Sequence, residues 1–412
     1  MKRLLICLLA VLLTASFVAC NAAISNDPNS DTNPTPDAET NGTIESEDES
    51  MSNSQNPLDG LVTRNFQALY PENGATVRIL NDAVYSFCNG YQLSNINRIT
   101  EYSHRDDYYP KSVALSFSCT QQALYYRVSV SRNSDMSNAD VYLLSKPEMV
   151  LENLFTGTQY FWQADAIITG GTLRSAVYSF TTDAGPRAIR LDGVSNTRDA
   201  GGMLTEDGKY RIKQGMIYRG GMLESISEKS RDVFVKTLGL KTDLDLRNTT
   251  ETGGRTVSPL GAELKYVNIT GRYYTNDFSE GNGIDGADNM ALMAQELRVF
   301  TKAENYPVYV HCSLGRDRTG TLIMLLQGLL GASKNDMALD YELSALSVNG
   351  TLDLDATRPS FFPSCFNATI SYIERNYSGA TLSKKIENYM LDTGLTADEI
   401  QAIKTIMLEE VQ

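Results

Sequence analysis

The chain changes its pattern of strands and helices once, near residue 184, and this change predicts two domains of different class. Residues 61–183 contain short runs rich in β-branched and aromatic residues, such as 112–117 and 125–130, which clusters of Asn, Ser, Asp and Gly separate. This pattern is typical of an all-β domain. The 412 residues, 42% of them hydrophobic, leave room for a second domain and a tail.

Residues 184–412 follow a different pattern, in which short strands alternate with helices. The strand candidates are 240–247, 266–269 and 308–311, and the helix candidates are 319–330, 372–376, 383–392 and 397–410. Ser333 is placed to cap one more helix. Such alternation predicts an α/β domain of three layers, a sheet flanked by helices.

One loop between a predicted strand and a predicted helix carries reactive side chains. Residues 310–320 read Val-His-Cys-Ser-Leu-Gly-Arg-Asp-Arg-Thr-Gly, so that five residues separate Cys312 from Arg318. That spacing lets the loop form a cup whose backbone N–H groups, with the first turn of the helix, point at one tetrahedral anion. The guanidinium of Arg318 can bind two oxygens of that anion, and the same donors favour a thiolate at Cys312. The loop therefore predicts a nucleophilic cysteine facing a bound phosphate.

The motif His-Cys-x-x-Gly-x-Asp-Arg-Thr-Gly at 311–320 resembles the signature of the cysteine-dependent protein tyrosine phosphatase superfamily. Within that superfamily, the chain is most similar to the bacterial branch of secreted tyrosine and lipid phosphatases. The similarity covers residues 190–410 and also rests on 196–202, Gly208, 218–221, 245–247 and 340–344. Arg316 is a departure, because the branch often has Lys there; the charge is kept but the donor geometry changes.

The resemblance implies a role for each residue of the loop. Cys312 attacks phosphorus and forms a phosphocysteine, while Arg318 binds the equatorial oxygens more tightly in the transition state. Thr319 is expected to hydrogen-bond the sulfur and help it leave in the second step. His311 is expected to brace the loop rather than act as a base, because neighbours on a strand point to opposite faces. The substrate-binding positions are Ser313, Leu314, Gly315, Arg316 and Gly320.

The general acid has several candidates. Many relatives carry an Asp on a mobile loop well before the cysteine, and Asp277, Asp285 and Asp288 fit that position. Asp317 lies inside the anion loop and matches an Asp that myotubularin-like lipid phosphatases are thought to use. We prefer Asp317 as the acid; the alternative is a carboxylate that only braces the loop through backbone N–H groups.

Further charged residues precede the loop in strand-like or turn-like places: Arg198, Asp199, Arg219, Asp245 and Arg247. By the resemblance they border the pocket or tie its walls together, although internal salt bridges without substrate contact explain them equally well. Arg316 adds a second cation beside Arg318, which suits substrates with more than one phosphate, such as phosphoinositides or inositol phosphates. A solvated arginine is the alternative.

The N-terminal residues resemble a bacterial lipoprotein signal. Lys2 and Arg3 precede an apolar run at 4–18, which is too short to span a bilayer comfortably and ends just before Cys20. The resemblance implies lipidation of Cys20 and a protein anchored in the bacterial cell envelope, facing outside the cytoplasm; an ordinary signal peptide or an anchor helix is the alternative. Residues 21–60 carry nine acidic side chains and no Lys or Arg, which predicts a disordered spacer.

The all-β region, 61–183, is similar to fibronectin type III domains, which are immunoglobulin-like sandwiches. Leu154, a Gly-containing turn and Tyr160 at the start of the next strand are typical of a tyrosine corner. Trp162 lies in a strand-like run and is expected to be a core residue rather than part of a ligand site. The sandwich is a candidate for binding a protein or glycan partner.

The remaining composition limits other functions. The net charge of −14 argues against a nucleic-acid binder. His104 and His311 lie in different predicted domains, and the six Cys do not have zinc-site spacing, so no metal and no other cofactor is expected. Cys7 would leave with the signal, and a disulfide between Cys88 and Cys119 is an open alternative outside the cytosol.

Together these features predict a phosphomonoester hydrolase that works through a phosphocysteine, as the resemblance implies. Its substrate would be a phosphotyrosine protein, another phosphorylated residue, as in dual-specificity enzymes, or a phosphoinositide. The alternatives are an inositol-phosphate phosphatase, a catalytically silent surface lipoprotein that binds phosphorylated ligands, or an adhesin whose β domain does the main work.

Overall fold

The computed structural model describes residues 65–91, 108–272, 283–347 and 361–411. The expected signal sequence, the spacer and Cys20 lie outside these residues, as do His104 and Asp277. Within the described ranges, no helix is both long enough and apolar enough to cross a membrane.

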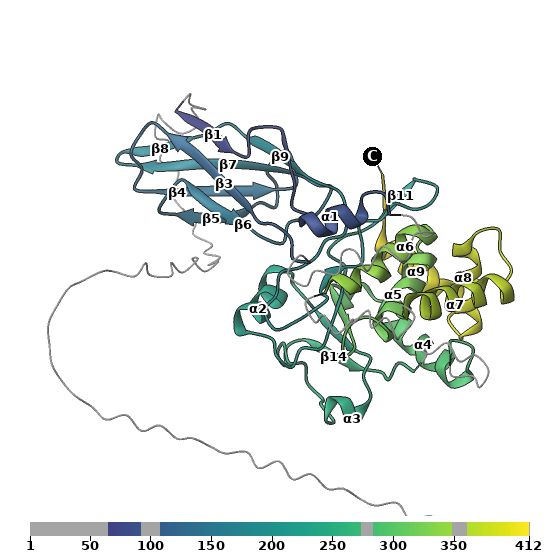
Figure 1. Cartoon of the computed structure of the whole chain (residues 1–412). Coiled ribbons are helices and arrows are strands. Elements are labelled where there is room, and N and C mark those ends of the chain that lie inside the picture. Colours follow the sequence, from purple (N-terminus) through teal and green to yellow (C-terminus); the bar gives the residue numbers. More distant parts are fainter. Residues whose placement is uncertain (1–64, 92–107, 273–282, 348–360, 412) are drawn as a thin grey trace, which may run out of the picture. The chain divides into compact units, whose positions relative to one another are not determined.

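The first part of the described chain forms two β-sheets (Figure 1). One sheet has the strand order β1 (Phe66–Tyr70), β3 (Val113–Cys119), β6 (Glu148–Leu151). The other has the order β2 (Ala75–Val77), β9 (Tyr178–Thr182), β7 (Gln159–Ile168), β4 (Tyr125–Ser131), β5 (Asp140–Leu144), and β8 (Gly171–Arg174) pairs with β7. Strands therefore dominate this region, as its sequence pattern predicts.

The two sheets share one apolar core. Phe117, Trp162 and Phe180, from three strands, are all buried in the same cluster. Trp162 is fully buried, which confirms the prediction that it is a core residue. The hydroxyl of Tyr160 accepts a hydrogen bond from the backbone N–H of Phe155 at 2.8 Å, which is the geometry of a tyrosine corner.

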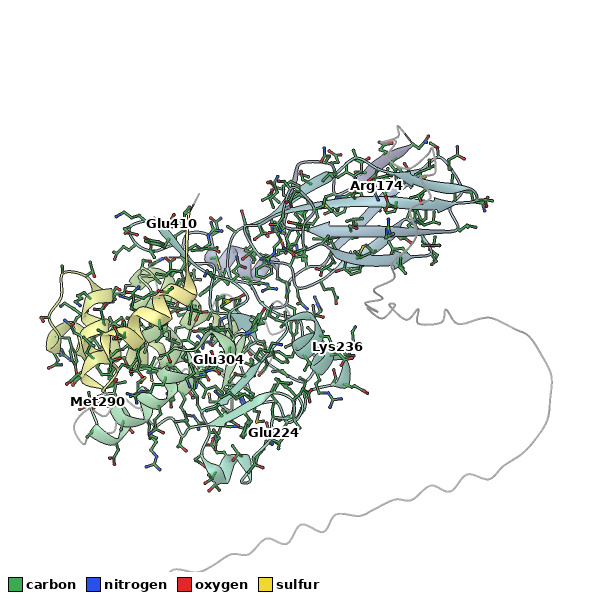
Figure 2. All side chains as sticks on the ribbon, turned by 180° about the vertical axis from the view of Figure 1, so that it is seen from behind. Arg174, Glu224, Lys236, Met290, Glu304 and Glu410 are labelled. Carbon is green, nitrogen blue, oxygen red and sulfur yellow. The ribbon has the colours of Figure 1, made fainter. Side chains whose placement is uncertain are left out.

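An ion cluster ties three neighbouring strands of the larger sheet together. Asp165 of β7 is buried and pairs with Arg127 of β4 at 2.6 Å and with Arg174 of β8 at 2.8 Å. Figure 2 labels Arg174. Both arginines remain about half exposed, so water screens this cluster.

The short helix α1 (Asp82–Cys88) separates Cys88 from Cys119. Val84 and Phe87 of α1 are buried in the same apolar cluster as the helices of the second part of the chain, and Cys88 packs against that cluster. Cys119, in contrast, ends β3 and packs against the core of the two sheets. Both thiols are free, and the disulfide considered from the sequence is not formed because the two residues belong to different cores.

The second part of the chain is built on a five-stranded sheet. Its order is β10 (Arg198–Asp199), β12 (Ile217–Gly220), β15 (Val308–His311), β13 (Thr242–Asp245), β14 (Lys265–Asn268). The last four strands are parallel, and β10 is antiparallel to β12. Their register places Gly220, His311, Asp245 and Asn268 at one edge, where ligands bind in open parallel sheets.

Apolar side chains cover both faces of this sheet. Val308 and Val310 of β15 face one cluster, while Tyr309 between them faces another, as strand alternation requires. Helices gather over the first face (Figure 1): α4 (Ala287–Val299), α5 (Arg318–Leu329), α6 (Lys334–Glu342), α7 (Phe361–Asn376), α8 (Leu382–Asp392), α9 (Ala397–Met407). On the second face, α2 (Glu228–Asp232) continues into a π-helical turn at Val233–Thr237, whose Phe234 is buried beside Tyr309. The predicted α/β architecture, with helices on a sheet, is confirmed.

The C-terminal segment differs from its predicted helix. Helix α9 ends at Met407, and β16 (Leu408–Glu410) pairs with β11 (Tyr210–Ile212) as an antiparallel ribbon. The prediction of one helix over 397–410 is wrong at its end, because the backbone of 408–410 finds its hydrogen bonds in a strand distant in sequence.

Candidate active site

The predicted anion loop connects β15 to α5. His311 ends the strand and Arg318 begins the helix, so that residues 312–317 lie at the carboxyl edge of the parallel sheet. All twelve residues of α5 are buried, which fixes the helix firmly against the sheet. The structure therefore brings Cys312 and Arg318 together on a rigid support.

The carbonyl groups of the loop are turned outward and bound by the scaffold. The carbonyl of Ser313 accepts from the N–H of Met222 at 3.2 Å, and that of Leu314 accepts from the amide of Asn196 at 3.0 Å. The guanidinium of Arg219 donates to the carbonyl of Gly315 at 2.7 Å.

Across a trans peptide the C=O of one residue and the N–H of the next point in opposite directions, so these outward carbonyls turn the N–H groups of Leu314, Gly315 and Arg316 into the loop. In the described part of the chain, the N–H groups of Leu314 and Gly315 donate to no other group. Buried donors without partners are costly, so this arrangement suits a bound anion.

Gly315 is required by the close approach of the loop to β12. Its φ of +67° lies in the left-handed region, and a Cβ atom there would lie 2.1 Å from the carbonyl oxygen of Gly220. Any larger residue would move the loop away from the strand that supports it.

A fully buried ion cluster stands behind the loop. Asp340 of α6 binds Nε of Arg198 at 2.7 Å and Nη1 of Arg219 at 2.6 Å. Burial alone would raise the pKa of Asp340, but the two guanidinium groups outweigh burial and lower it. Arg219 thus connects the carbonyl of Gly315 directly to Asp340 of α6. Arg198 binds the same carboxylate from β10.

Asp199 makes its contacts away from the loop. It accepts hydrogen bonds from the N–H groups of Gly201 at 2.9 Å and Gly215 at 2.5 Å, and it pairs with Arg187 at 3.0 Å. Arg187 also donates to the carbonyl of Asn153 at 2.6 Å. These contacts match the alternative that Asp199 forms an internal salt bridge.

His311 is fully buried and turned toward carboxylates. Its Nε2 lies 2.9 Å from Asp243 and 3.8 Å from Asp245. Burial alone would lower the pKa of His311, but Asp243 and then Asp245 raise it above its ordinary value. The side chain therefore braces the strand beneath the loop.

Asp245 and Arg247 form an ion cluster at the end of β13. Arg247 donates to Asp245 through Nε at 2.9 Å and Nη2 at 2.7 Å, and its Nη1 lies 2.8 Å from Glu224. Glu224, labelled in Figure 2, also pairs with Arg255 at 2.9 Å. Arg247 thus connects the end of β13 to the segment that follows β12, and these two strands lie on either side of β15.

Glu251 is the residue of the site that the sequence reasoning missed. It lies on the short helix α3 (Thr249–Thr252) and binds Arg318 through both oxygens, at 2.7 and 2.8 Å. The hydroxyl of Ser313 donates to it at 3.0 Å. The hydrogen bond from Arg318 is the largest cause that lowers the pKa of Glu251 to about 2.

One sequence signal, a capping box, could have predicted the helix that carries Glu251, and the strand pairing then places that helix beside the loop. Asn248 and Glu251 have the spacing of a capping box, and the structure forms both of its hydrogen bonds. The helix follows β13, which is parallel and adjacent to β15, so its start must lie next to the loop that follows β15.

The remaining catalytic candidates have distinct surroundings. Arg316 donates through Nε to Asp317 at 2.7 Å, and both side chains are about one-fifth exposed.

The hydroxyl of Thr319 is buried and, among the described residues, has no hydrogen-bond partner, so its bond to sulfur stays a prediction. Gly320 packs against Tyr341 of α6, where a Cβ atom would lie 2.7 Å from the ring. Cys312 is itself buried, with 2% of its surface exposed.

The alternative acids lie around the start of α4. Asp285 precedes α4 and, after the larger effect of burial, raises the pKa of Tyr372 on α7. Asp288 is exposed on the first turn of α4.

Comparison with known proteins agrees with this geometry. The model of the family described as "Tyrosine phosphatase family" matches residues 189–409, which is more than half of the chain. A Cupriavidus necator protein named "Putative tyrosine-protein phosphatase" is 26% identical over 188 residues, covering 38% of this chain and 63% of that relative. The chain thus spans less than two thirds of the length of this relative.

A solved structure gives a more distant similarity. The core catalytic domain of the PP-IP phosphatase SIW14 from S. cerevisiae, in complex with citrate, is 20% identical, with 38% of this chain and 85% of that chain covered and a TM-score of 0.24. The family match, which includes the whole anion loop, decides the assignment. The chain belongs to the tyrosine phosphatase family of phosphate ester hydrolases.

Proposed function

We propose that this chain hydrolyses phosphate monoesters through a phosphocysteine on Cys312. The observation that carries the proposal is the loop whose three carbonyls are bound outside and whose N–H groups face inward, between Cys312 and Arg318. This cup stabilises the charge of the transferred phosphoryl group.

The reaction takes two displacements. The thiolate of Cys312 attacks phosphorus, the P–O bond of the ester breaks, and a general acid gives its proton to the leaving oxygen. Water then attacks phosphorus and gives a proton to the same residue, the P–S bond breaks, and Cys312 leaves as a thiolate. Arg318 and the N–H groups bind the equatorial oxygens throughout, and Thr319 would assist the departure of sulfur.

Asp317 is the proposed general acid. It stands at the N-terminal end of α5 in the loop itself, partly exposed and held by Arg316, whereas Asp285 lies outside the loop, just before α4. The pH dependence of kcat tests this choice: the limb that reports the acid should disappear in Asp317→Asn and remain in Asp285→Asn. The opposite pattern would assign the role to Asp285.

A catalytically silent binding protein is the rival function. Rapid-mixing kinetics with an aryl phosphate separates the two, because the proposed mechanism releases one equivalent of phenol per active site before phosphate. Cys312→Ser should abolish this burst and still bind phosphate. Binding without any release of phenol by the unaltered protein would favour the rival.

The natural substrate and the location of the protein are also proposals. A phosphotyrosine protein and a phosphoinositide both present the monoester that the loop requires, and Arg316, which pairs with Asp317, does not by itself decide between them. The resemblance of residues 1–20 to a lipoprotein signal supports a lipid anchor at Cys20. Labelling with a fatty acid analogue in a bacterial host tests this: the label should be lost in Cys20→Ala, and its persistence would reject the anchor.

A further inference from the structure

A polar cleft opens beside Arg318, outside the anion loop. It has a volume of about 440 Å³ and lies between α3 and the segment that follows β14. Its walls carry the hydroxyls of Thr249, Thr250 and Thr270, the amide of Asn248 and the guanidinium of Arg272. The volume is in the range of small-molecule sites, about 300–1,000 Å³, and exceeds the need of one phosphate.

The backbone fixes the position of Arg272 next to the loop. The N–H of Gly271 donates to the carbonyl of Leu246 at 3.0 Å, which holds the segment against the end of β13. A Cβ atom on Gly271 would lie 3.4 Å from Cγ of Arg318, so the backbone at Gly271 passes close to the side chain of Arg318. Arg272 therefore follows a residue that lies close to the side chain of Arg318, and all three residues line the cleft.

The charges around the cleft leave Arg272 available. Arg318 is bound by Glu251, and Arg316 is bound by Asp317. Arg272 is exposed and, within the described ranges, pairs with no carboxylate. The negative charge of Glu251 also faces the cleft, but Arg318 neutralises it, so a second anion would bind at the side of Arg272.

The lining also indicates the chemistry of the ligand. Among the described residues that line the cleft, none has an aromatic or large aliphatic side chain, which is what an aryl ring would need. Hydroxyls, an amide and a guanidinium instead match the oxygens of a phosphorylated polyol.

We propose that Arg272, with Thr249, Thr250 and Thr270, forms a second anion subsite that holds a phosphate of the substrate that is not cleaved. The inference rests on the proposed phosphatase function and names its substrate class: a polyol with phosphates close together, either a free inositol phosphate or a phosphoinositide headgroup. Arg272 acts here as a specificity residue and takes no part in the chemical step.

Steady-state kinetics of the full chain tests the subsite. Arg272→Gln is compared with the unaltered protein and with Arg231→Gln, a half-exposed arginine on α2. The substrates are an aryl monophosphate, a soluble inositol trisphosphate with adjacent phosphates, and a short-chain phosphatidylinositol bisphosphate. Parallel effects on the last two would identify the shared headgroup, and an effect on only one identifies the free or the lipid source.

In Arg272→Gln, KM for the polyphosphates should rise at least tenfold. This fold-change should be at least ten times larger than the fold-change in KM for the aryl phosphate. Arg272→Lys should recover part of the loss, and Arg231→Gln should behave as the unaltered protein. Equal changes for all substrates, or no change, would overturn the subsite.

Binding to the Cys312→Ser protein separates failure of the subsite from failure of the enzyme. Calorimetry with inositol trisphosphate should show a loss of affinity of at least tenfold when Arg272→Gln is added. If this loss is seen but the unaltered protein hydrolyses no ester, the subsite stands and the phosphatase function fails. If hydrolysis is seen but the affinity is unchanged, the phosphatase function stands and the subsite fails.

Discussion

Replacing Asp340 by Asn tests whether the buried ion cluster holds the anion loop in place. Asn has nearly the same shape but no charge, so Arg198 and Arg219 would be left as two buried cations without their shared counterion. The link from α6 through Arg219 to the carbonyl of Gly315 would weaken at the same time.

The expected cost follows from the burial of all three groups. Arg198 and Arg219 are fully buried and Asp340 is 3% exposed, so water cannot screen the uncompensated charge. Removing one partner of such a pair costs about 3–5 kcal/mol. For a domain of this size that corresponds to a fall in Tm of roughly 6–20 °C.

The pH dependence gives an independent check on the same pair. The pKa of Asp340 is lowered in the folded chain, so its contribution to the free energy of unfolding is present above its ordinary pKa and lost as the pH falls through the lowered value. The unaltered protein should therefore lose this contribution in acid, and Asp340→Asn should lack that component.

Two matched aspartates calibrate the measurement. Asp165 also binds two arginines, but these are half exposed, and Asp165→Asn should give an intermediate loss in urea unfolding. Asp82 binds Arg78 and Lys111 at an exposed site, and Asp82→Asn should give no measurable loss. A loss in Asp340→Asn no larger than that in Asp82→Asn would refute the reasoning, as would an unchanged kcat.

Three further predictions concern the loop and the β-sheets. Glu251→Gln should lower the free energy of unfolding at neutral pH by about 1–2 kcal/mol, a value that discounts the lowering of the pKa to about 2 because Glu251 is partly exposed. Urea unfolding at several pH values should show that the unaltered protein loses this contribution as the pH falls from 4.5 toward 2. Gly315→Ala should lower kcat and cost more than the roughly 1–3 kcal/mol of backbone strain, whereas Gly239→Ala, at a similar φ with no atom within 4 Å, should cost only the strain. Tyr160→Phe should cost about 1 kcal/mol in urea unfolding, because it removes the acceptor of the N–H of Phe155 and nothing else, and an unchanged midpoint would show that water replaces the bond.

The sequence predicts the parts of the site that are local in the chain. The loop from Cys312 to Arg318 and its place between a strand and a helix follow from residue spacing and from strand and helix patterns. The structure confirms this placement. The burial of Trp162 in a core and the hydrogen bond of Tyr160 likewise follow from short sequence segments.

Contacts between distant segments could not be predicted in this way. The pairing of Glu251 with Arg318 depends on the parallel register of β13 and β15, which no local pattern specifies. The strand at 408–410 depends on a partner about two hundred residues earlier, and the free state of Cys88 depends on which core α1 joins. In each case the deciding neighbour is remote in sequence.

The position of α1 has a consequence for anyone who divides this protein into fragments. Leu80, Val84, Phe87, Tyr91 and Tyr108 precede residue 184, yet their side chains belong to the apolar cluster beneath the anion loop. A catalytic fragment that begins at 184 would expose the hydrophobic surface that these residues cover. It would also lack the hydroxyl of Tyr108, which accepts a hydrogen bond from Arg198. Such a fragment is expected to aggregate on expression, whereas one that begins before β1 keeps the cores of both parts complete.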